Sequence, residues 1–236
     1  MKNFLPHAIL LDFYGTVVEE DDIPIGKICN EISKVSPLTV TTAEIGSYWS
    51  HAFSQLCSQS FGTTFRSQKE LEQLSLQRVL QHFKADLDSD ALSRILYEYW
   101  VRPTIFPESR EVLVRCKRPI CLVSNIDNAE LKLALKHCNL HFDWVVTSED
   151  CRAYKPHAEA FEKALYLLDL PASEVLHVGD SFSSDVCGAK SLGIPVLWIN
   201  REKKQISCVD EAPEYISTDL TGLLNLLEET DGIDIR

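Results

Sequence analysis

Five short, continuous runs of apolar residues constrain the fold of this chain most strongly. Each run has four or five residues, is rich in Val, Ile and Leu, and ends in polar residues or glycine. Continuous rather than alternating hydrophobicity is typical of strands that are buried on both faces, as they are in a parallel sheet. The five runs cover residues 8–11, 120–123, 144–147, 175–178 and 195–199.

Helical patterns of crossover length separate the later four runs. Apolar residues recur at helical spacing over 128–137 and 156–168, and a shorter segment over 185–192 ends at Gly193. Strand–helix–strand repeats of this kind form right-handed crossovers within one parallel sheet. The sequence therefore predicts an α/β fold with a doubly wound parallel sheet. A further helix is expected over 220–227, near the C-terminus.

The gap between the first two runs is different. About a hundred residues separate them, and residues 24–99 carry the spacing of several helices, most clearly over 71–83 and 91–100. The segment contains no strand pattern of convincing length. So long a connection is best explained as a helical insert. We therefore expect a core domain of residues 1–19 and 104–236, and a helical domain of residues 20–103.

Composition disfavours several classes of function. The formal net charge of −12 argues against nucleic acid or an anionic membrane as a partner. No apolar run is long enough to span a bilayer and the start lacks a signal-peptide pattern, so a cytoplasmic location is expected. The eight cysteines show no zinc-type spacing, and we interpret them as reduced thiols. Monomer and homodimer both stay open.

Polar residues follow the predicted strands where each strand ends. In doubly wound sheets, ligands bind beyond the carboxyl ends of the strands, so these residues are expected to converge. In chain order they are Asp12, Ser124, Asn125, Lys155, Asp180 and Asp185. A carboxylate can attack phosphorus, and carboxylate oxygens suit a hard cation such as magnesium. A lysine and a hydroxyl can hold the non-bridging oxygens of a phosphoryl group.

At this point the sequence resembles the haloacid dehalogenase superfamily of hydrolases. Four motifs of that superfamily occur in order along the chain. They are Asp12-Phe13-Tyr14-Gly15-Thr16, Ser124-Asn125, Lys155-Pro156, and Gly179-Asp180-Ser181 followed by Asp185. The resemblance implies a core sheet in the strand order 5-4-1-2-3. It also implies a helical cap of the C1 type just after the first motif, which matches the insert above.

The resemblance also implies a role for each motif residue. Asp12 would be the nucleophile, with Lys155 and Ser124 as the other catalytic residues. The expected substrate-binding residues are Thr16, Ser124, Lys155 and a backbone N–H of Asn125. The expected ligands of a Mg²⁺ cofactor are Asp12, the backbone carbonyl of Tyr14, Asp180 and Asp185, the last two directly or through water.

Tyr14 departs from the phosphatase pattern. Phosphatases of the superfamily carry a second Asp at this position, which protonates the leaving group and then activates water. A phenol with a pKa of about 10 is a poor replacement at neutral pH. Tyr at this position resembles the metal-independent 2-haloacid dehalogenases of the same superfamily. So do the segments Tyr154-Lys155-Pro156 and Trp198-Ile199-Asn200-Arg201.

Two features argue against the dehalogenase reaction. The arginine that holds the halide in those enzymes has its counterpart here in Ser50, and no arginine precedes Arg66. The fourth motif also keeps the metal-binding Asp180, and three crowded carboxylates call for a cation. The sequence thus favours magnesium-dependent hydrolysis of a small, anionic phosphate ester. A 2-haloacid dehalogenase and a weakly active binding or regulatory protein remain as alternatives.

Residues of the helical cap are expected to set specificity for a small substrate. The candidates in its first helices are Tyr48, Trp49, His51 and Phe53. The aromatic residues equally suit packing within the cap. His51 is the candidate for a polar contact, and for supplying the proton that Tyr14 cannot.

Overall fold

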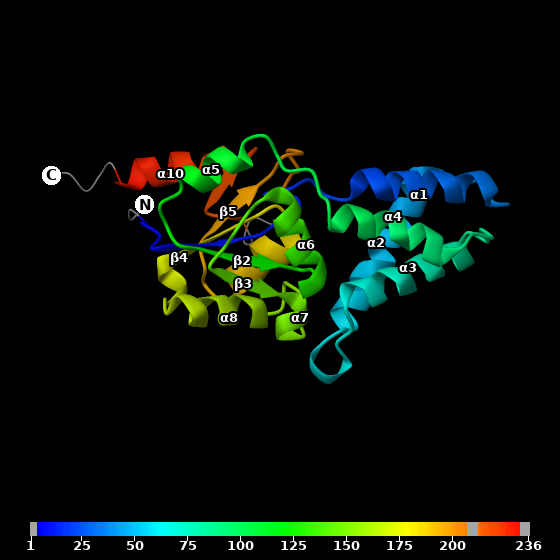
Figure 1. The fold of residues 1–236 in the computed structure, drawn as a ribbon, viewed down its shortest axis with the longest axis horizontal. Coiled ribbons are helices and arrows are strands. Elements are labelled where there is room, and N and C mark those ends of the chain that lie inside the picture. Colours follow the sequence, from blue (N-terminus) through cyan, green and yellow to red (C-terminus); the bar gives the residue numbers. More distant parts are fainter. Residues whose placement is uncertain (1–3, 207–211, 232–236) are drawn as a thin grey trace.

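A parallel sheet forms the centre of the molecule. The structure is a computed structural model that describes residues 4–206 and 212–231. Within these residues the strands lie in the order β3-β2-β1-β4-β5-β6, all with parallel neighbours (Figure 1). Their bounds are β1 Ala8–Leu11, β2 Ile120–Ser124, β3 Trp144–Thr147, β4 Val175–Gly179, β5 Val196–Ile199 and β6 Tyr215–Ser217. The predicted order of five strands is confirmed, and β6 extends the β5 edge.

Burial on both faces explains why these short runs become strands. All four residues of β1 have no exposed surface, and neighbouring side chains enter opposite layers. Ile9 and Leu11 pack into one apolar core, whereas Ala8 and Leu10 pack into the other. The strand ends are also aligned, because Leu11 pairs with Leu122 of β2 and Val178 of β4. The polar residues that follow are therefore brought to one edge.

Helices cover both faces of the sheet. One apolar core receives residues of α5 (Ser109–Arg115), α6 (Asn128–Cys138) and α10 (Thr221–Asp231), and the other receives residues of α8 (Glu159–Leu168) and α9 (Gly188–Ser191). The crossover helices predicted over 128–137 and 156–168 are present, although α8 begins three residues later. Short elements complete the core: α7 (Ser148–Cys151), a π-helical segment (Phe182–Cys187), and 3₁₀ turns at Gly62–Thr64 and Ala172–Glu174.

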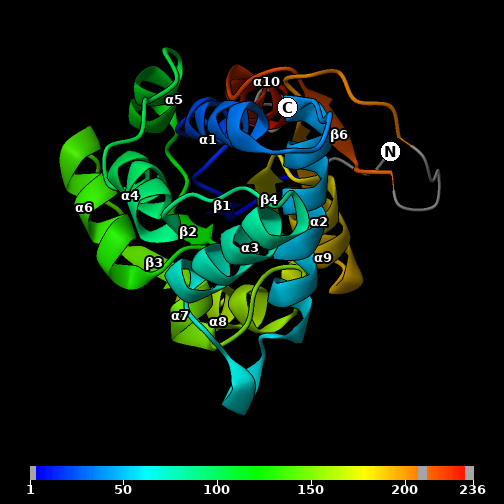
Figure 2. The ribbon, with the colours of Figure 1, turned by 90° about the vertical axis from the view of Figure 1, so that its right-hand side faces the viewer.

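Four helices between β1 and β2 form the insert. They are α1 (Asp22–Val35), α2 (Thr42–Gln59), α3 (Gln68–His82) and α4 (Ser89–Trp100). Capping boxes at Thr41 with Glu44 and at Ser67 with Glu70 explain why α2 and α3 begin where they do. The four helices lie to one side of the sheet in Figure 1, and Figure 2 views the molecule from that side.

Hydrogen bonds join the insert to the rest of the chain. Asp127, just before α6, accepts from the backbone N–H groups of Gln68 and Lys69 at the start of α3, at 2.8 and 3.1 Å. Tyr154 donates its hydroxyl proton to the carbonyl of Arg66 at 2.8 Å. The insert is thus held over the sheet edge where the motif residues lie. Within the described residues, no helix combines the length and apolar character needed to cross a membrane.

Candidate active site

Three carboxylates meet at the carboxyl end of the sheet. Asp12 follows β1 and Asp180 follows β4, whereas Asp185 lies in the π-helical segment. One oxygen from each lies within 4.8 Å of the others. Asp12 and Asp185 are buried, and Asp180 is partly exposed. The structure therefore brings together the three acidic residues that the sequence singled out.

Two glycines make this close approach possible. A Cβ atom on Gly179 would lie 2.4 Å from Cγ of Asp185, and one on Gly15 would lie 2.5 Å from Cγ of Asp180. Gly15 also has a φ of +83°, which residues with a side chain rarely adopt. Both glycines leave the space that the carboxylates occupy, which explains their place beside the two acidic motifs.

Lys155 ties two of the carboxylates together. Its Nζ donates to Oδ1 of Asp12 at 2.7 Å, to Oδ1 of Asp185 at 2.6 Å and to the carbonyl of Val123 at 2.9 Å. All three ammonium protons are therefore used, and the lysine side chain is 2% exposed. His177 completes the cluster from β4, with Nε2 at 2.9 Å from Oδ1 of Asp185. Sequence reasoning missed this histidine, because it lies within an apolar strand.

Burial and neighbouring charges shift the pKa values of the three carboxyl groups. Burial raises the pKa of Asp12, and Lys155 opposes that rise. Burial also raises the pKa of Asp180 well above its usual value, and the neighbouring Asp12 and Asp185 add to the rise. Burial would raise the pKa of Asp185 too, but Lys155 and His177 outweigh it and hold that pKa below its usual value. Asp180 is the carboxylate that one lysine leaves uncompensated.

The remaining motif residues fall into two groups. Ser124 and Asn125 line a pocket together with Asp12 and Lys155. The side chain of Asn125 also clamps the backbone of Lys155, because Oδ1 accepts from its N–H at 2.8 Å and Nδ2 donates to its carbonyl at 3.1 Å. Thr16 is fully buried, outside the lining of this pocket, and its hydroxyl lies 3.4 Å from Oδ1 of Asp180. This position favours a contact of the Thr16 hydroxyl with Asp180 over a contact with a ligand in the pocket.

Tyr14 lines the pocket but directs its hydroxyl to the insert. The phenol donates to the backbone carbonyl of Trp100, the last residue of α4, at 2.5 Å. Burial raises its pKa well above the usual value. The phenol therefore keeps its proton, which is donated to Trp100, and it cannot serve as a base at neutral pH.

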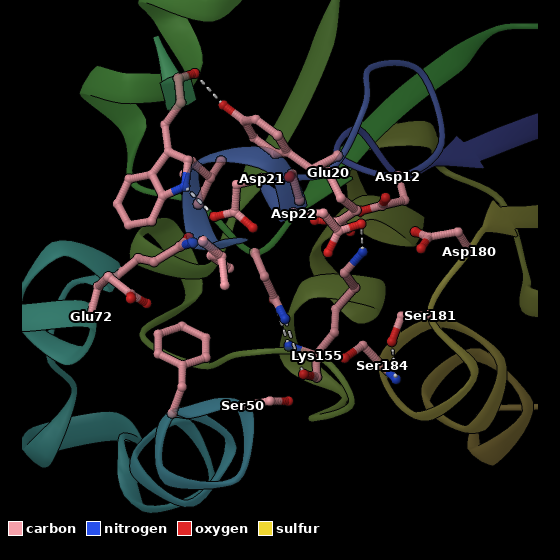
Figure 3. Close-up of a pocket in the computed structure, with 18 of the residues that line it drawn as sticks. Asp12, Glu20, Asp21, Asp22, Ser50, Glu72, Lys155, Asp180, Ser181 and Ser184 are labelled. Carbon is pink, nitrogen blue, oxygen red and sulfur yellow. Dashed lines mark hydrogen bonds and ion pairs between the residues drawn. The ribbon is translucent and has the colours of Figure 1, made fainter. Parts of the chain in front are cut away.

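The pocket lies between the sheet edge and the insert and has a volume of about 470 Å³. A cavity of this size suits a small molecule. Figure 3 shows Asp12, Asp180 and Ser181 on one side of it and Glu72 of α3 on the other. In the part of the chain that the structure describes, seven carboxyl groups line it: Asp12, Glu20, Asp21, Asp22, Glu72, Asp180 and Asp185. Lys155 is the one cationic side chain among the described lining residues.

The insert contributes some of the expected residues and others that were missed. Trp49, Ser50 and Phe53 line the pocket. Tyr48 and His51 do not, since Tyr48 stacks on the ring of His82 and the side chain of His51 is exposed. The prediction that His51 makes a polar contact in the pocket is therefore wrong. Glu20, Asp21, Glu72 and Trp100 were missed, because their spacing follows no motif.

Comparison with known proteins identifies the family of this chain. A family model described as a haloacid dehalogenase-like hydrolase matches residues 6–193. The chain belongs to the haloacid dehalogenase-like hydrolases. This family membership confirms the resemblance drawn from the four motifs, and it identifies the chain as a hydrolase.

Relatives within this family differ in their reactions. The zebrafish (Danio rerio) haloacid dehalogenase-like hydrolase domain-containing protein 3 is 37% identical over 144 residues, which cover 57% of this chain and 58% of that protein. A glyceraldehyde 3-phosphate phosphatase from Pyrococcus furiosus is 31% identical over 135 residues, covering 54% of this chain and 56% of that protein. The matched part thus spans less than two thirds of either relative.

The fold of this hydrolase has a close likeness among solved structures. An L-2-haloacid dehalogenase has a TM-score of 0.79 and 22% identity, with coverage of 95% of this chain and 99% of that chain. At this level of identity the likeness shows the shared fold. The choice between phosphate and halogen chemistry in this family member therefore depends on its own side chains.

The acidic cluster of this hydrolase fits a divalent cation. Asp12, Asp180 and Asp185 offer oxygen ligands, which suit magnesium. Asp180 is crowded by two carboxylates, and a bound cation would relieve that repulsion. Both oxygens of Asp185 already have partners within the protein. Oδ1 contacts Lys155 and His177, and Oδ2 accepts from the N–H of Ser181 at 3.0 Å.

Proposed function

We propose that this hydrolase is a magnesium-dependent phosphatase of small phosphate esters, with Asp12 as its nucleophile. The observation that supports this proposal best is the three-carboxylate cluster beside Lys155, in a pocket whose described lining contains no arginine. The helices of residues 20–103 act as a cap over that pocket in this proposal. The residues 1–19 and 104–236 form the core domain.

Attack by Asp12 opens the proposed reaction. Oδ1 of Asp12 is held by Lys155, which leaves Oδ2 to attack phosphorus. The bond between phosphorus and the ester oxygen then breaks, and the leaving alcohol takes the electron pair and a proton from the carboxyl group of Glu20, which lines the pocket. Ser124 and a backbone N–H of Asn125 hold the non-bridging oxygens. Water next attacks the phosphorus of the aspartyl phosphate, which releases inorganic phosphate and restores the Asp12 carboxylate.

A magnesium ion would neutralise charge on the transferring phosphoryl group when bound. Asp12, Asp180 and the backbone carbonyl of Tyr14 are the proposed ligands. Because both oxygens of Asp185 already accept hydrogen bonds, we assign it to the site through water or through its hold on Lys155.

The first test is hydrolysis of a generic aryl phosphate with and without magnesium. The wild-type chain should release phosphate only with the metal, and Asp12→Asn should abolish the release. Glu98→Gln, an exposed change on α4, serves as the control and should retain full activity. Metal-independent activity of equal size would refute the proposal.

Dehalogenation is the second candidate, and Tyr14 is the residue that favours it. Against it, Ser50 lines the pocket near the place where the resemblance calls for a halide-binding arginine. Among the described lining residues, a halide leaving group would find no free cation, because the three protons of Lys155 are already donated. We therefore expect no chloride release from 2-chloropropionate.

A binding protein, the third alternative, would bind magnesium yet turn over no member of a phosphate-ester panel.

A further inference from the structure

The pocket has a second acidic end that the proposed hydrolysis does not use. Glu72 projects from α3 into the pocket and is only 6% exposed. Its Oε1 has no hydrogen-bond partner among the described residues. A buried carboxyl oxygen without a partner is costly, so such a group is expected to meet a donor when a ligand binds. Figure 3 places Glu72 across the pocket from Asp180.

Aromatic rings line the same end of the pocket. Trp49 of α2 and Trp100 of α4 are almost fully buried, and Phe53 lies on the same helix as Trp49. Both indole N–H groups are already donated, from Trp49 to Oγ of Ser75 at 2.9 Å and from Trp100 to Oδ2 of Asp21 at 2.8 Å. The two tryptophans therefore line the pocket without a free N–H group, so that a ligand can meet only their rings. Aromatic rings beside carboxylates are the usual surroundings of an ammonium group.

The charged groups of the whole pocket also favour a cationic ligand at this end. The described lining residues carry seven carboxyl groups and one ammonium group, and the protons of that ammonium group are all donated within the protein. A divalent cation and a phosphate dianion would cancel each other, which leaves more carboxyl groups than Lys155 can neutralise, and a cationic group on the substrate would favour the ionised form of these carboxyl groups. A second anionic group on the substrate would be repelled, whereas a cationic group would be attracted.

We infer that Glu72, Asp21 and the rings of Trp49 and Trp100 form a recognition site for an ammonium group. The substrate class is accordingly an aminoalkyl phosphate, which carries a phosphate ester at one end and a protonated amine at the other. This inference rests on the proposed function for the phosphate end. Glu72 is the residue that sets specificity, because its unpartnered oxygen would accept a proton of the ammonium group, and the positive charge of that group would favour the ionised form of the Glu72 carboxyl.

Direct binding of two matched probes tests the inference without turnover. The probes are 3-aminopropylphosphonate and n-butylphosphonate, which have the same chain length but end in an ammonium and a methyl group. Neither has an ester bond to cleave. Affinities would be measured by titration calorimetry on the full chain with magnesium, for wild type, Glu72→Gln and the exposed control Glu98→Gln.

A charge-assisted hydrogen bond should make the wild-type chain bind the amino probe at least about tenfold more tightly than the butyl probe. Glu72→Gln should reduce that preference to about threefold or less, since an amide attracts an ammonium group weakly. The control should keep the full preference. Affinity for inorganic phosphate should be unchanged in Glu72→Gln, which shows that the variant is folded and its phosphate end intact.

Equal binding of the two probes by the wild-type chain would overturn the inference. So would an unchanged preference in Glu72→Gln. If aryl phosphate is hydrolysed while the probes bind equally, the inference fails and the proposed function stands. If the amino probe is preferred through Glu72 but no phosphate ester is hydrolysed, the recognition site stands and the proposed function fails.

Discussion

Tyr14 donates its hydroxyl proton to the backbone carbonyl of Trp100 at 2.5 Å. The bond joins the segment that carries Asp12, the proposed nucleophile, to the last residue of the helical insert. The position that holds a catalytic acid in related phosphatases is thus used here to tie the insert to the sheet edge. Tyr14 is therefore expected to act in the placement of α4.

Tyr14→Phe tests that role. Loss of one buried hydrogen bond should lower the free energy of unfolding by about 1 kcal/mol. The shape of the pH–rate profile should stay the same, because the phenol carries no proton in the reaction. Urea unfolding and aryl phosphate hydrolysis measure the two effects. Tyr166→Phe, at a side chain that is 83% exposed, is the control for stability. A lost limb in the pH–rate profile would make Tyr14 an acid or base after all.

Gly179→Ala tests the packing of the acidic cluster. The new methyl group would overlap Cγ of Asp185 at 2.4 Å, so Asp185 and its hold on Lys155 must shift. We expect magnesium affinity and turnover to fall by at least about tenfold. Gly26→Ala is the matched control, because nothing lies within 4 Å of a Cβ atom there. Magnesium titration followed by the hydrolysis rate gives both values, and equal affinities in the two variants would contradict the assignment.

Glu72 should make the stability of the chain depend on pH. Burial, and then the charge of Asp21, raises the pKa of Glu72 from 4.5 to about 8. A raised pKa in the folded state means that stability is full below the ordinary value and is lost as the pH rises toward the raised one. The loss is about 1.4 kcal/mol for each unit of pKa shift. Glu72→Gln should remove it.

Urea unfolding at about pH 5 and about pH 8 measures this effect. The wild-type chain should lose more unfolding free energy between the two pH values than Glu72→Gln does. Glu98→Gln should behave like the wild type. A parallel decline in all three chains would show that Glu72 is ionised in the folded protein across this range.

Glu20 is the carboxyl group that we expect to carry the proton that Tyr14 cannot. It lines the pocket, and loss of solvent there, with the charges of Asp180, Asp21 and Asp12, raises its pKa well above the usual value. Glu20→Gln should lower turnover by about a hundredfold at neutral pH. Asp22→Asn likewise replaces a carboxyl group of the same pocket by an amide and is the control. Equal rates in the two variants would assign the proton transfer elsewhere.

The strands of the core were predictable from the sequence because their residues are buried and therefore apolar. The five apolar runs became strands within one residue of their expected ends, because burial on both faces leaves a strong local pattern. Tyr215–Ser217 was missed, since this edge strand is short and its Ile216 is 52% exposed. The predicted helix over 185–192 is divided into a π-helical segment and α9, because the helical turns begin earlier, at the N-cap Ser181.

The motif residues of the candidate site were predictable because they follow strands. Asp12, Ser124 and Asp180 lie at the carboxyl ends of strands, whose alignment the topology dictates, and Lys155 follows β3 after the short helix α7. Glu72 and Trp100 reach the pocket from helices of the insert, and their placement depends on how those helices pack. The clamp of Asn125 on Lys155 depends on the loop after β3. Such contacts leave no periodic signal in a sequence.

The aspartyl phosphate at Asp12 is the central feature of the proposed reaction. The direct measurement is the mass of the intact chain after acid quenching during turnover of an aryl phosphate with magnesium. We predict a fraction of wild-type chains heavier by one phosphoryl group, located on the peptide that contains Asp12, and none in Asp12→Asn. Turnover with no such species at any quench time, or a phosphoryl group on another residue, would contradict Asp12 as the nucleophile.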